Sequence, residues 1–221
     1  MPDQRRPLRT VVRRVVLTVN TPMARVRLRR AVARAPRPIA LEVGGLRRRP
    51  GWLVVNVNAL ARNYLDATRP WPFEDGALSY VFADNMIEHV PLDAGRSFLA
   101  EAHRCLRPGG VIRLLTPDVR YHVDLYLKGG SSVVDGDLAR LYRSVGALVE
   151  HPVDILRTPI ADFGHYRGYV YDFEALDTEL QRAGFQPAVR KPLGESDHPP
   201  LVGLDDRVVD GPAQLVVEAT R

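Results

Sequence analysis

The chain has 221 residues, the length of one ordinary α/β domain that can bury a real core, and nothing in it calls for a second folded domain. Its single cysteine, Cys105, excludes an internal disulfide and a cysteine-built metal site, and it suits a cytoplasmic location. No stretch is apolar over the ~18 residues that a transmembrane helix needs. Arg13 and Arg14 interrupt the first apolar run, so we expect no signal peptide.

The positive charge is concentrated at the N-terminus. Residues 1–50 contain 14 arginines and two acidic residues, a balance of +12, and since the whole chain carries +5, the remaining residues carry −7. One helical face of this segment collects Val11, Val12, Val15, Val16 and Val19. A second helix is predicted from Thr21, as its N-cap, through Pro22 to Arg34.

We therefore divide the chain into a basic amphipathic helical segment, 1–37, and a folded domain, 38–221. Two uses of the basic segment remain open. In the first, residues 1–36 lie on an anionic membrane surface, and the protein is peripheral at the inner membrane. In the second, the apolar face of these residues packs on the domain while the arginines are solvated. Nucleic-acid binding is not expected, because the segment has no aromatic residue on which bases could stack.

Several apolar runs predict the strands of a buried sheet. They are Pro38–Val43, Leu53–Val57, Leu78–Ala83 and the run after Gly110. Gly44 and Gly45 follow the first run directly, and glycines at the carboxyl end of a strand let a ligand approach the backbone. The stretch from Glu101 to Val119 reads as a helix ended by Pro108, a Gly-Gly turn and a strand.

The second half of the chain predicts helices followed by two strands. Helices are expected from Val119 to Leu127, from about Gly136 to Val149, and after Asp172, which caps a helix ended by Gly184. Residues 120–170 are expected to cover a substrate. Phe185–Pro192 and Gln214–Ala219 predict the last two strands.

This series of motifs resembles class I S-adenosylmethionine-dependent methyltransferases, of the type 11-like kind associated with polysaccharide synthesis. The resemblance rests on the Gly-Gly loop, on Gly51-Trp52, on the phrase MIEHV, on E-x-x-R-x-L-R-P-G-G and on the C-terminal GHYRGYVYDF. It implies a Rossmann-like, doubly wound and mostly parallel sheet of seven strands that ends in an antiparallel hairpin.

The resemblance also implies S-adenosyl-L-methionine as the cofactor and a set of residues that bind it: Glu42, Gly44, Gly45, Asn56, Asp66 and Asn85. The sequence departs from the family pattern at two places, directly after Gly45 and at Asn56. Leu46 and three arginines stand where small residues are usual, and Asn56 replaces an aspartate that would accept hydrogen bonds from both ribose hydroxyls. An amide offers one accepting oxygen and no charge in that place.

Methyl transfer to a hydroxyl needs a base, and histidine is the side chain that titrates near neutral pH. The candidates in order are His165, His89 and His198, each of which could also be a hydrogen-bonded loop residue. The sequence has no nucleophile-elbow serine, no histidines at zinc spacing and no phosphate loop with a lysine, so hydrolase, metalloenzyme and P-loop functions are excluded.

The predicted function is methyl transfer from S-adenosylmethionine to a hydroxyl of a sugar or lipid-linked glycan, and the expected partner is a small-molecule or glycan acceptor. The alternative is an inactive methyltransferase-like module that binds or scaffolds, which the departures at Leu46, Asn56 and Ser79 keep open.

Overall fold

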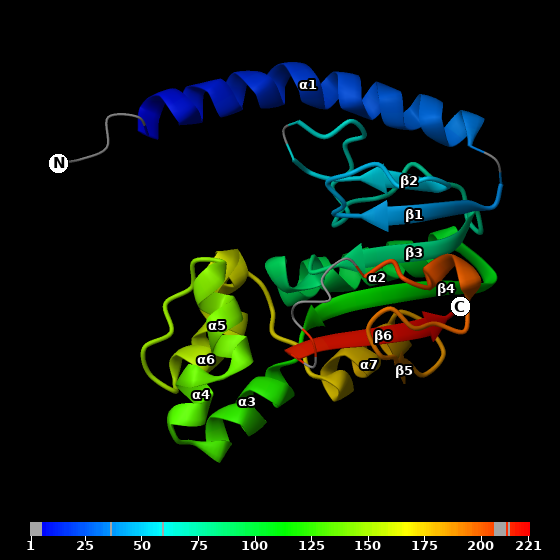
Figure 1. The fold of residues 1–221 in the computed structure, drawn as a ribbon. Coiled ribbons are helices and arrows are strands. Elements are labelled where there is room, and N and C mark those ends of the chain that lie inside the picture. The colour runs from blue at the N-terminus through cyan, green and yellow to red at the C-terminus, as the bar shows by residue number, and fades with distance from the viewer. Residues whose placement is uncertain (1–5, 36, 59, 206–210, 212) are drawn as a thin grey trace.

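The computed structural model describes residues 6–35, 37–58, 60–205, 211 and 213–221, with the side chains of 6–17, 131 and 132 left undescribed. The described residues form one six-stranded sheet in the order β2-β1-β3-β4-β6-β5 (Figure 1). Its strands are β1 Ile39–Val43, β2 Trp52–Val55, β3 Leu78–Asp84, β4 Leu106–Pro117, β5 Val189–Arg190 and β6 Gln214–Thr220.

The sheet confirms the predicted α/β class and its mixed direction. β2, β1, β3 and β4 are parallel, and β6 pairs antiparallel with both β4 and β5. The seventh strand predicted from the resemblance is not among the described strands. Beyond β2, the described residues form a single isolated parallel bridge between Asn56 and Tyr64.

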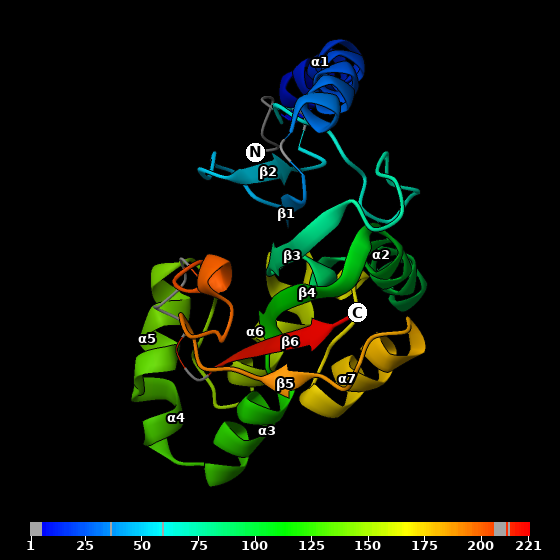
Figure 2. The ribbon, with the colours of Figure 1, turned by 90° about the vertical axis from the view of Figure 1, so that its right-hand side faces the viewer.

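The two faces of the sheet are covered differently. Figure 2 shows α2 (Leu92–Cys105) and α7 (Phe173–Arg182) on one face, where Leu99, Leu114 and Leu180 belong to the main core. The other face packs a smaller cluster of Phe82, Leu115 and Val216 against the segment around η3 (Pro199–Leu201). A core on both faces explains why the central strands are mostly apolar. Arg113 of β4 is buried as well, and it pairs with Asp205 and Glu218.

The helix α2 ends in a clamp that accounts for the E-x-x-R motif. Glu101 and Arg104 pair at 2.8 Å, Glu101 accepts the N–H of Trp71 at 2.5 Å, and Arg104 also binds Asp75 at 2.6 Å and the carbonyl of Phe73 at 3.0 Å. These bonds hold residues 71–75 against the helix. The 71–75 turn leads into β3, so the clamp positions the strand that carries the candidate site.

The start of β4 corrects the prediction made for the Pro-Gly-Gly turn. α2 already ends at Cys105, and β4 begins at Leu106, so the glycines lie inside the strand. The pairing of β3 with β4 jumps from Leu78 opposite Leu106 to Tyr80 opposite Val111, which places residues 107–110 in a bulge. Gly109 adopts φ +74°, a value that a bulge of this kind requires of glycine.

The first helix also differs from the prediction. α1 runs without a break from Arg6 to Arg34 and contains Pro22, so Thr21 is not the cap of a second helix. The face that carries Ala24 and Leu28 is buried on the domain, and this packing stabilises a helix that propensity alone would interrupt. The predicted face of Val11, Val12, Val15 and Val16 lies outside the described side chains.

The connection between β1 and β2 is unusual for parallel strands. Residues 44–51, all described, contain no helix, although a parallel crossover normally uses a dozen or more residues and a helix. α1 instead arches over the outer edge of the sheet beside β2 (Figure 1). Arg27 Nε donates to the carbonyl of Arg62 at 2.8 Å and Asn20 donates to Ala61 at 3.1 Å, which fixes α1 to the loop after β2.

The predicted covering segment consists of short helices near the carboxyl ends of β3 and β4 (Figure 1). They are α3 Val119–Lys128, α4 Ser131–Asp135, α5 Asp137–Ser144, α6 Asp154–Ala161 and the 3-10 helix η2 Asp162–Arg167. A small core of its own holds this group together, with Val133, Tyr142 and Ile155 buried in it. Asp118 caps α3 and Asp172 caps α7 through side-chain bonds to backbone N–H groups, which confirms the predicted cap at Asp172.

Candidate functional site

A cleft of about 610 Å³ lies at the carboxyl ends of β1, β2 and β3. β2 lies on one side of β1 and β3 lies on the other side, so the order of the strands reverses at β1. Ligands of open α/β sheets bind at such a switch point. The described residues that line it are Val43, Gly44, Asn56, Val57, Tyr64–Thr68, Asn85, Met86, His89–Pro91 and Ala94.

The floor of the cleft is backbone in left-handed conformations. Gly44 has φ +88° and its N–H donates to the carbonyl of Val55 at 2.9 Å. Asn85 has φ +46°, which asparagine tolerates better than most residues, and its side chain donates to Asp84 at 2.7 Å. Both residues therefore turn the chain sharply where β1 and β3 end.

Asn56 ties together the loops that follow β1 and β2. Its Nδ2 donates to the carbonyls of Gly44 at 2.7 Å and Gly45 at 3.2 Å, and its Oδ1 accepts the N–H of Asn58 at 2.8 Å. Only an amide can donate and accept in this way, whereas a carboxylate would face two carbonyl oxygens. The structure thus gives a local reason for asparagine at the position where the resemblance suggests aspartate.

Asp66 lies on the opposite wall and is partly engaged. Its Oδ1 accepts the N–H of Thr68 at 3.1 Å and the hydroxyl of Thr68 at 2.7 Å, in an Asx turn. The side chain is 39% exposed, and its Oδ2 is 4.0 Å from the guanidinium of Arg69. Asp66 is the one carboxylate among the described residues that line the cleft.

Glu42 and Gly45 are not among the residues that line the cleft. Glu42 pairs with Arg49 at 2.7 Å on the other face of β1. A Cβ on Gly45 would lie 2.4 Å from the Glu42 carboxylate, so Gly45 allows these two segments to pack closely. The structure brings Gly44, Asn56, Asp66 and Asn85 to one cleft, and it places the other two predicted cofactor residues beside a second cavity.

The two histidines predicted as bases meet at one end of the cleft. The rings of His89 and His165 are 4.8 Å apart between centroids. His89 is exposed at the cleft wall, while His165 in η2 is only 8% exposed. His165 Nδ1 lies 3.1 Å from the carbonyl of Thr158 and must donate its proton there, so the neutral ring keeps Nε2 as its acceptor.

Glu88, the residue before His89, completes this cluster. It is 2% exposed and lies in η1 (Ile87–His89). One ligand atom each from Glu88, His89 and His165 lies within 4.8 Å of the others, so these side chains could also hold a metal ion. The spacing in the chain hid this possibility, because His165 comes from a distant segment.

Gly168 sets the distance between the two segments of the cluster. A Cβ placed on Gly168 would lie 1.7 Å from the carbonyl oxygen of Glu88, a contact that no side-chain-bearing residue could make without movement. The phrase HYRGY in the sequence contains this glycine but gives no sign of its partner. His198, the third predicted base, packs against Tyr80 with ring centroids 6.1 Å apart and does not join the cluster.

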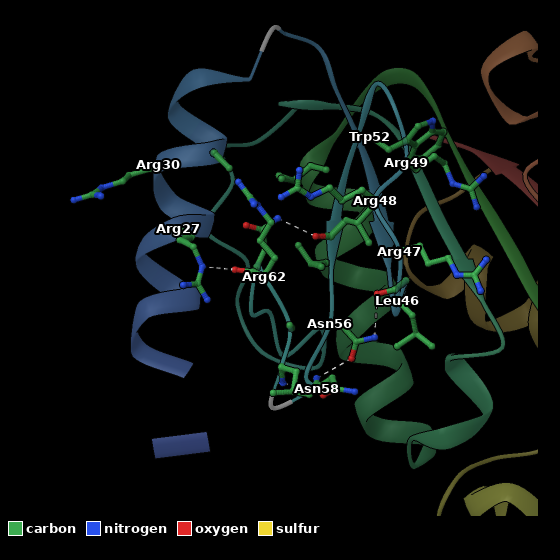
Figure 3. A pocket seen from close by; sticks show the side chains of 18 of the residues that line it. Arg27, Arg30, Leu46, Arg47, Arg48, Arg49, Trp52, Asn56, Asn58 and Arg62 are labelled. Carbon is green, nitrogen blue, oxygen red and sulfur yellow. Dashed lines mark hydrogen bonds between the residues drawn. The ribbon is translucent and has the colours of Figure 1, made fainter. Parts of the chain in front are cut away.

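A second cavity, of about 810 Å³, lies between α1 and the outer edge of the sheet. Figure 3 shows arginines around it from α1, from the β1–β2 connection and from the loop after β2. Asn56 lines this cavity as well as the cleft. The two cavities are therefore neighbours across one asparagine side chain.

A protein-family model matches part of the chain. The family model described as a methyltransferase domain matches residues 54–114, from within β2 into β4. A search of curated protein sequences found no significant match. None of the described helices is long and apolar enough to span a bilayer.

Solved structures of methyltransferases show a distant similarity. A SAM-dependent methyltransferase from Archaeoglobus fulgidus is 13% identical, with 90% of this chain and 93% of that chain covered and a TM-score of 0.48. A possible histamine N-methyltransferase from Thermotoga maritima is 15% identical, with 90% and 91% covered and a TM-score of 0.45.

A third similar structure is phosphoethanolamine N-methyltransferase 2 of Haemonchus contortus in complex with S-adenosyl-L-methionine. It is 14% identical, with 87% of this chain and 52% of that chain covered and a TM-score of 0.44. Within the present chain, the segment that matches the methyltransferase domain contains Asn56, Asp66, Asn85 and His89, the main polar residues of the cleft.

Proposed function

We propose that the protein transfers a methyl group from S-adenosyl-L-methionine to a hydroxyl of a sugar or lipid-linked glycan. The observation that carries this proposal is the match of residues 54–114 to the methyltransferase domain, because that segment supplies most of the cleft. The cleft lies at the switch point of the sheet, and its volume of about 610 Å³ is within the usual range for small-molecule sites.

The residues of the cleft fit this cofactor. Leu65, Ala67 and Met86 offer an apolar wall for a purine ring, and Asp66 offers a carboxylate oxygen as acceptor for polar groups. Gly44 presents backbone without a Cβ at the end of β1, where a Cβ would approach Met86 to 3.3 Å. Glycine at this position therefore leaves room for Met86, which lines the same cleft.

When bound, S-adenosylmethionine supplies a methyl group that its sulfonium already activates. The protein must hold the acceptor oxygen and take up its proton. His89 is the base in this proposal, since it lines the cleft. His165 packs against the His89 ring, and Glu88 places a carboxyl oxygen within 4.8 Å of a ring nitrogen of each histidine.

A specific observation supports work at a membrane surface, with a lipid-linked acceptor. On α1, the side chains of Val19, Met23 and Val26 are 57%, 48% and 47% exposed. They lie on the side opposite Ala24 and Leu28, so one face of the helix packs on the domain and another faces outward. Exposed apolar residues among arginines suit the interface of an anionic membrane.

Flotation with anionic vesicles tests the membrane contact. A triple variant in which Val19, Met23 and Val26 are replaced by glutamate should no longer float, while the wild type should. This variant is preferable to removal of α1, which would uncover the buried Leu28. Equal flotation of the two proteins would reject the outward face of α1 as the contact.

Calorimetric titration with S-adenosylmethionine and S-adenosylhomocysteine separates the enzyme from an inactive binding module. We expect both ligands to bind, and no binding at millimolar ligand would reject the enzyme. Transfer from labelled cofactor to glycan and lipid-linked acceptors then tests the base. His89→Gln should lower the rate by about 100-fold or more, with cofactor binding kept, whereas the control His198→Gln should behave as the wild type.

A further inference from the structure

The cavity between α1 and β2 is surrounded by positive charge. Its lining comes from four segments: α1, residues 45–49 of the β1–β2 connection, residues 52–55 of β2, and residues 56, 58 and 60–63 of the loop after β2. None of the described lining residues is an aspartate or a glutamate. Seven of them are arginines: Arg27, Arg30, Arg34, Arg47, Arg48, Arg49 and Arg62.

The fold creates this cavity by leaving out a helix. Because residues 44–51 connect β1 to β2 directly, no crossover helix covers this part of the sheet. α1 stands over the gap, and its bonds from Arg27 to Arg62 and from Asn20 to Ala61 keep the gap at a fixed width. The cavity is thus part of the architecture and does not depend on one flexible side chain.

The arginines fall into three groups. Arg27 and Arg49 are held in place: Arg27 Nη2 donates to Asn20 at 2.7 Å, and Arg49 pairs with Glu42 and lies over the Phe82 ring at 5.6 Å. Arg30 points away from the strands in Figure 3. No described residue forms an ion pair with the other four, Arg34, Arg47, Arg48 or Arg62, and all four are exposed.

Among the described lining arginines only Arg49 pairs with an acidic residue, Glu42. The positive charges therefore outnumber the negative ones in this concave space, and concave low-dielectric walls concentrate the resulting field. Guanidinium groups bind phosphate oxygens in a bidentate manner, which is stronger and more directional than contact with a single ammonium. Trp52, Leu53 and Leu60 add apolar surface to the same lining. The chemistry therefore suits an anion attached to a less polar group.

We propose that this cavity binds a diphosphate-bearing ligand, either a soluble diphosphate or the diphosphate headgroup of a lipid. The volume of about 810 Å³ accommodates a diphosphate and part of the group it carries. The ligand would also lie next to the cleft, because Asn56 lines both cavities. Binding here stands independently of methyl transfer and of the outward face of α1.

Direct binding to the full chain tests the proposal. Inorganic pyrophosphate should bind saturably in a calorimeter, and its affinity should fall with added salt. The double variant Arg48→Gln/Arg62→Gln should weaken binding about tenfold or more, as expected for the loss of charge-assisted hydrogen bonds. Arg107→Gln is the matched control, since Arg107 is an exposed arginine of β4 outside the cavity.

A second arm separates the two sources of the ligand. Vesicles made of a neutral lipid, with a lipid diphosphate added as the one anionic component, are floated with the wild type and with the double variant. Binding of pyrophosphate identifies a soluble diphosphate site, while binding of these vesicles alone, lost in the double variant, identifies a lipid headgroup site.

The proposal is overturned if neither probe binds, or if the double variant and Arg107→Gln lose affinity equally. It is also overturned if vesicle binding survives in the double variant but is lost when Val19, Met23 and Val26 are replaced by glutamate. An unchanged thermal unfolding curve shows that the double variant is folded, and this control does not depend on cofactor binding or on methyl transfer.

Discussion

The Cα of Gly168 packs against the backbone of Glu88 so closely that a Cβ on the glycine would lie 1.7 Å from the Glu88 carbonyl oxygen. This contact joins the turn after η2 to η1, and it holds the His165 ring 4.8 Å from the His89 ring. Two segments that are far apart in the chain thereby contribute to one cluster.

Gly168→Ala should therefore separate the two histidines. The new methyl group would overlap the Glu88 carbonyl oxygen, so η2 must move away from η1. The rate of methyl transfer should then fall at least tenfold. S-adenosylhomocysteine should still bind, because Gly168 does not line the cleft. Gly203→Ala provides the control, because Gly203 has φ +69° with open space around it and reports backbone strain alone. Equal activity of the two variants would contradict this account.

Asn56→Asp should destabilise the protein. It replaces the donors to the carbonyls of Gly44 and Gly45 by carboxylate oxygens, and the expected loss is ~1–3 kcal/mol of unfolding free energy, measured by denaturant titration. S-adenosylhomocysteine should bind more weakly as well.

The neighbouring Asn58→Asp is the control for this change. Among the described residues, the side chain of Asn58 accepts one hydrogen bond, from the N–H of Leu60 at 2.9 Å, and a carboxylate keeps that bond. Tighter cofactor binding by Asn56→Asp would instead mean that residue 56 acts mainly on the ribose.

Glu101 should make stability depend on pH in acid. Arg104, followed by the N–H of Trp71, lowers the pKa of Glu101 below its ordinary value of 4.5. Its contribution is therefore fully present above pH 4.5 and is lost as the pH falls through the lower pKa of the folded state.

We expect Glu101→Gln to cost ~1–3 kcal/mol at neutral pH, with the difference from wild type shrinking in acid. Unfolding followed by tryptophan fluorescence measures this, since Trp71 contacts the changed residue. Glu150→Gln, at an exposed position, is the control. A difference that stays constant from neutral to acid pH would refute the role of the Glu101 charge.

Cys105 should be inert in the folded protein. It is fully buried in the core, and burial raises its pKa to about 12, so that only ~0.01% is thiolate at pH 8. Alkylation by iodoacetamide, followed by mass spectrometry, should proceed only on unfolding. Equal labelling of native and denatured protein would show that the helix α2 opens readily.

The sequence predicts those parts of the fold that local patterns determine. Ile39–Val43, Leu78–Asp84 and the helix capped by Asp172 appear where apolar runs and capping residues place them. The break predicted at Thr21 is absent, because the packing of Ala24 and Leu28 on the domain outweighs the cost of an internal proline.

Contacts between distant segments explain what the sequence does not reveal about the site. Neither the meeting of His89 with His165 nor the buried position of Glu88 follows from spacing, since both depend on how Gly168 packs. The role of Asn56 likewise depends on the positions of two carbonyls in another loop. The resemblance predicts which residues bind the cofactor, and packing shows what those residues touch.

The direct connection between β1 and β2 has a consequence for how this protein can change. A helix that begins after the first strand offers free N–H groups of the main chain to anions, whatever its sequence. Residues 44–51 contain no such helix, so charge at this corner of the sheet comes from side chains, which single codon changes can add, remove or reverse. Selectivity for charged ligands can evolve here without any change in the fold.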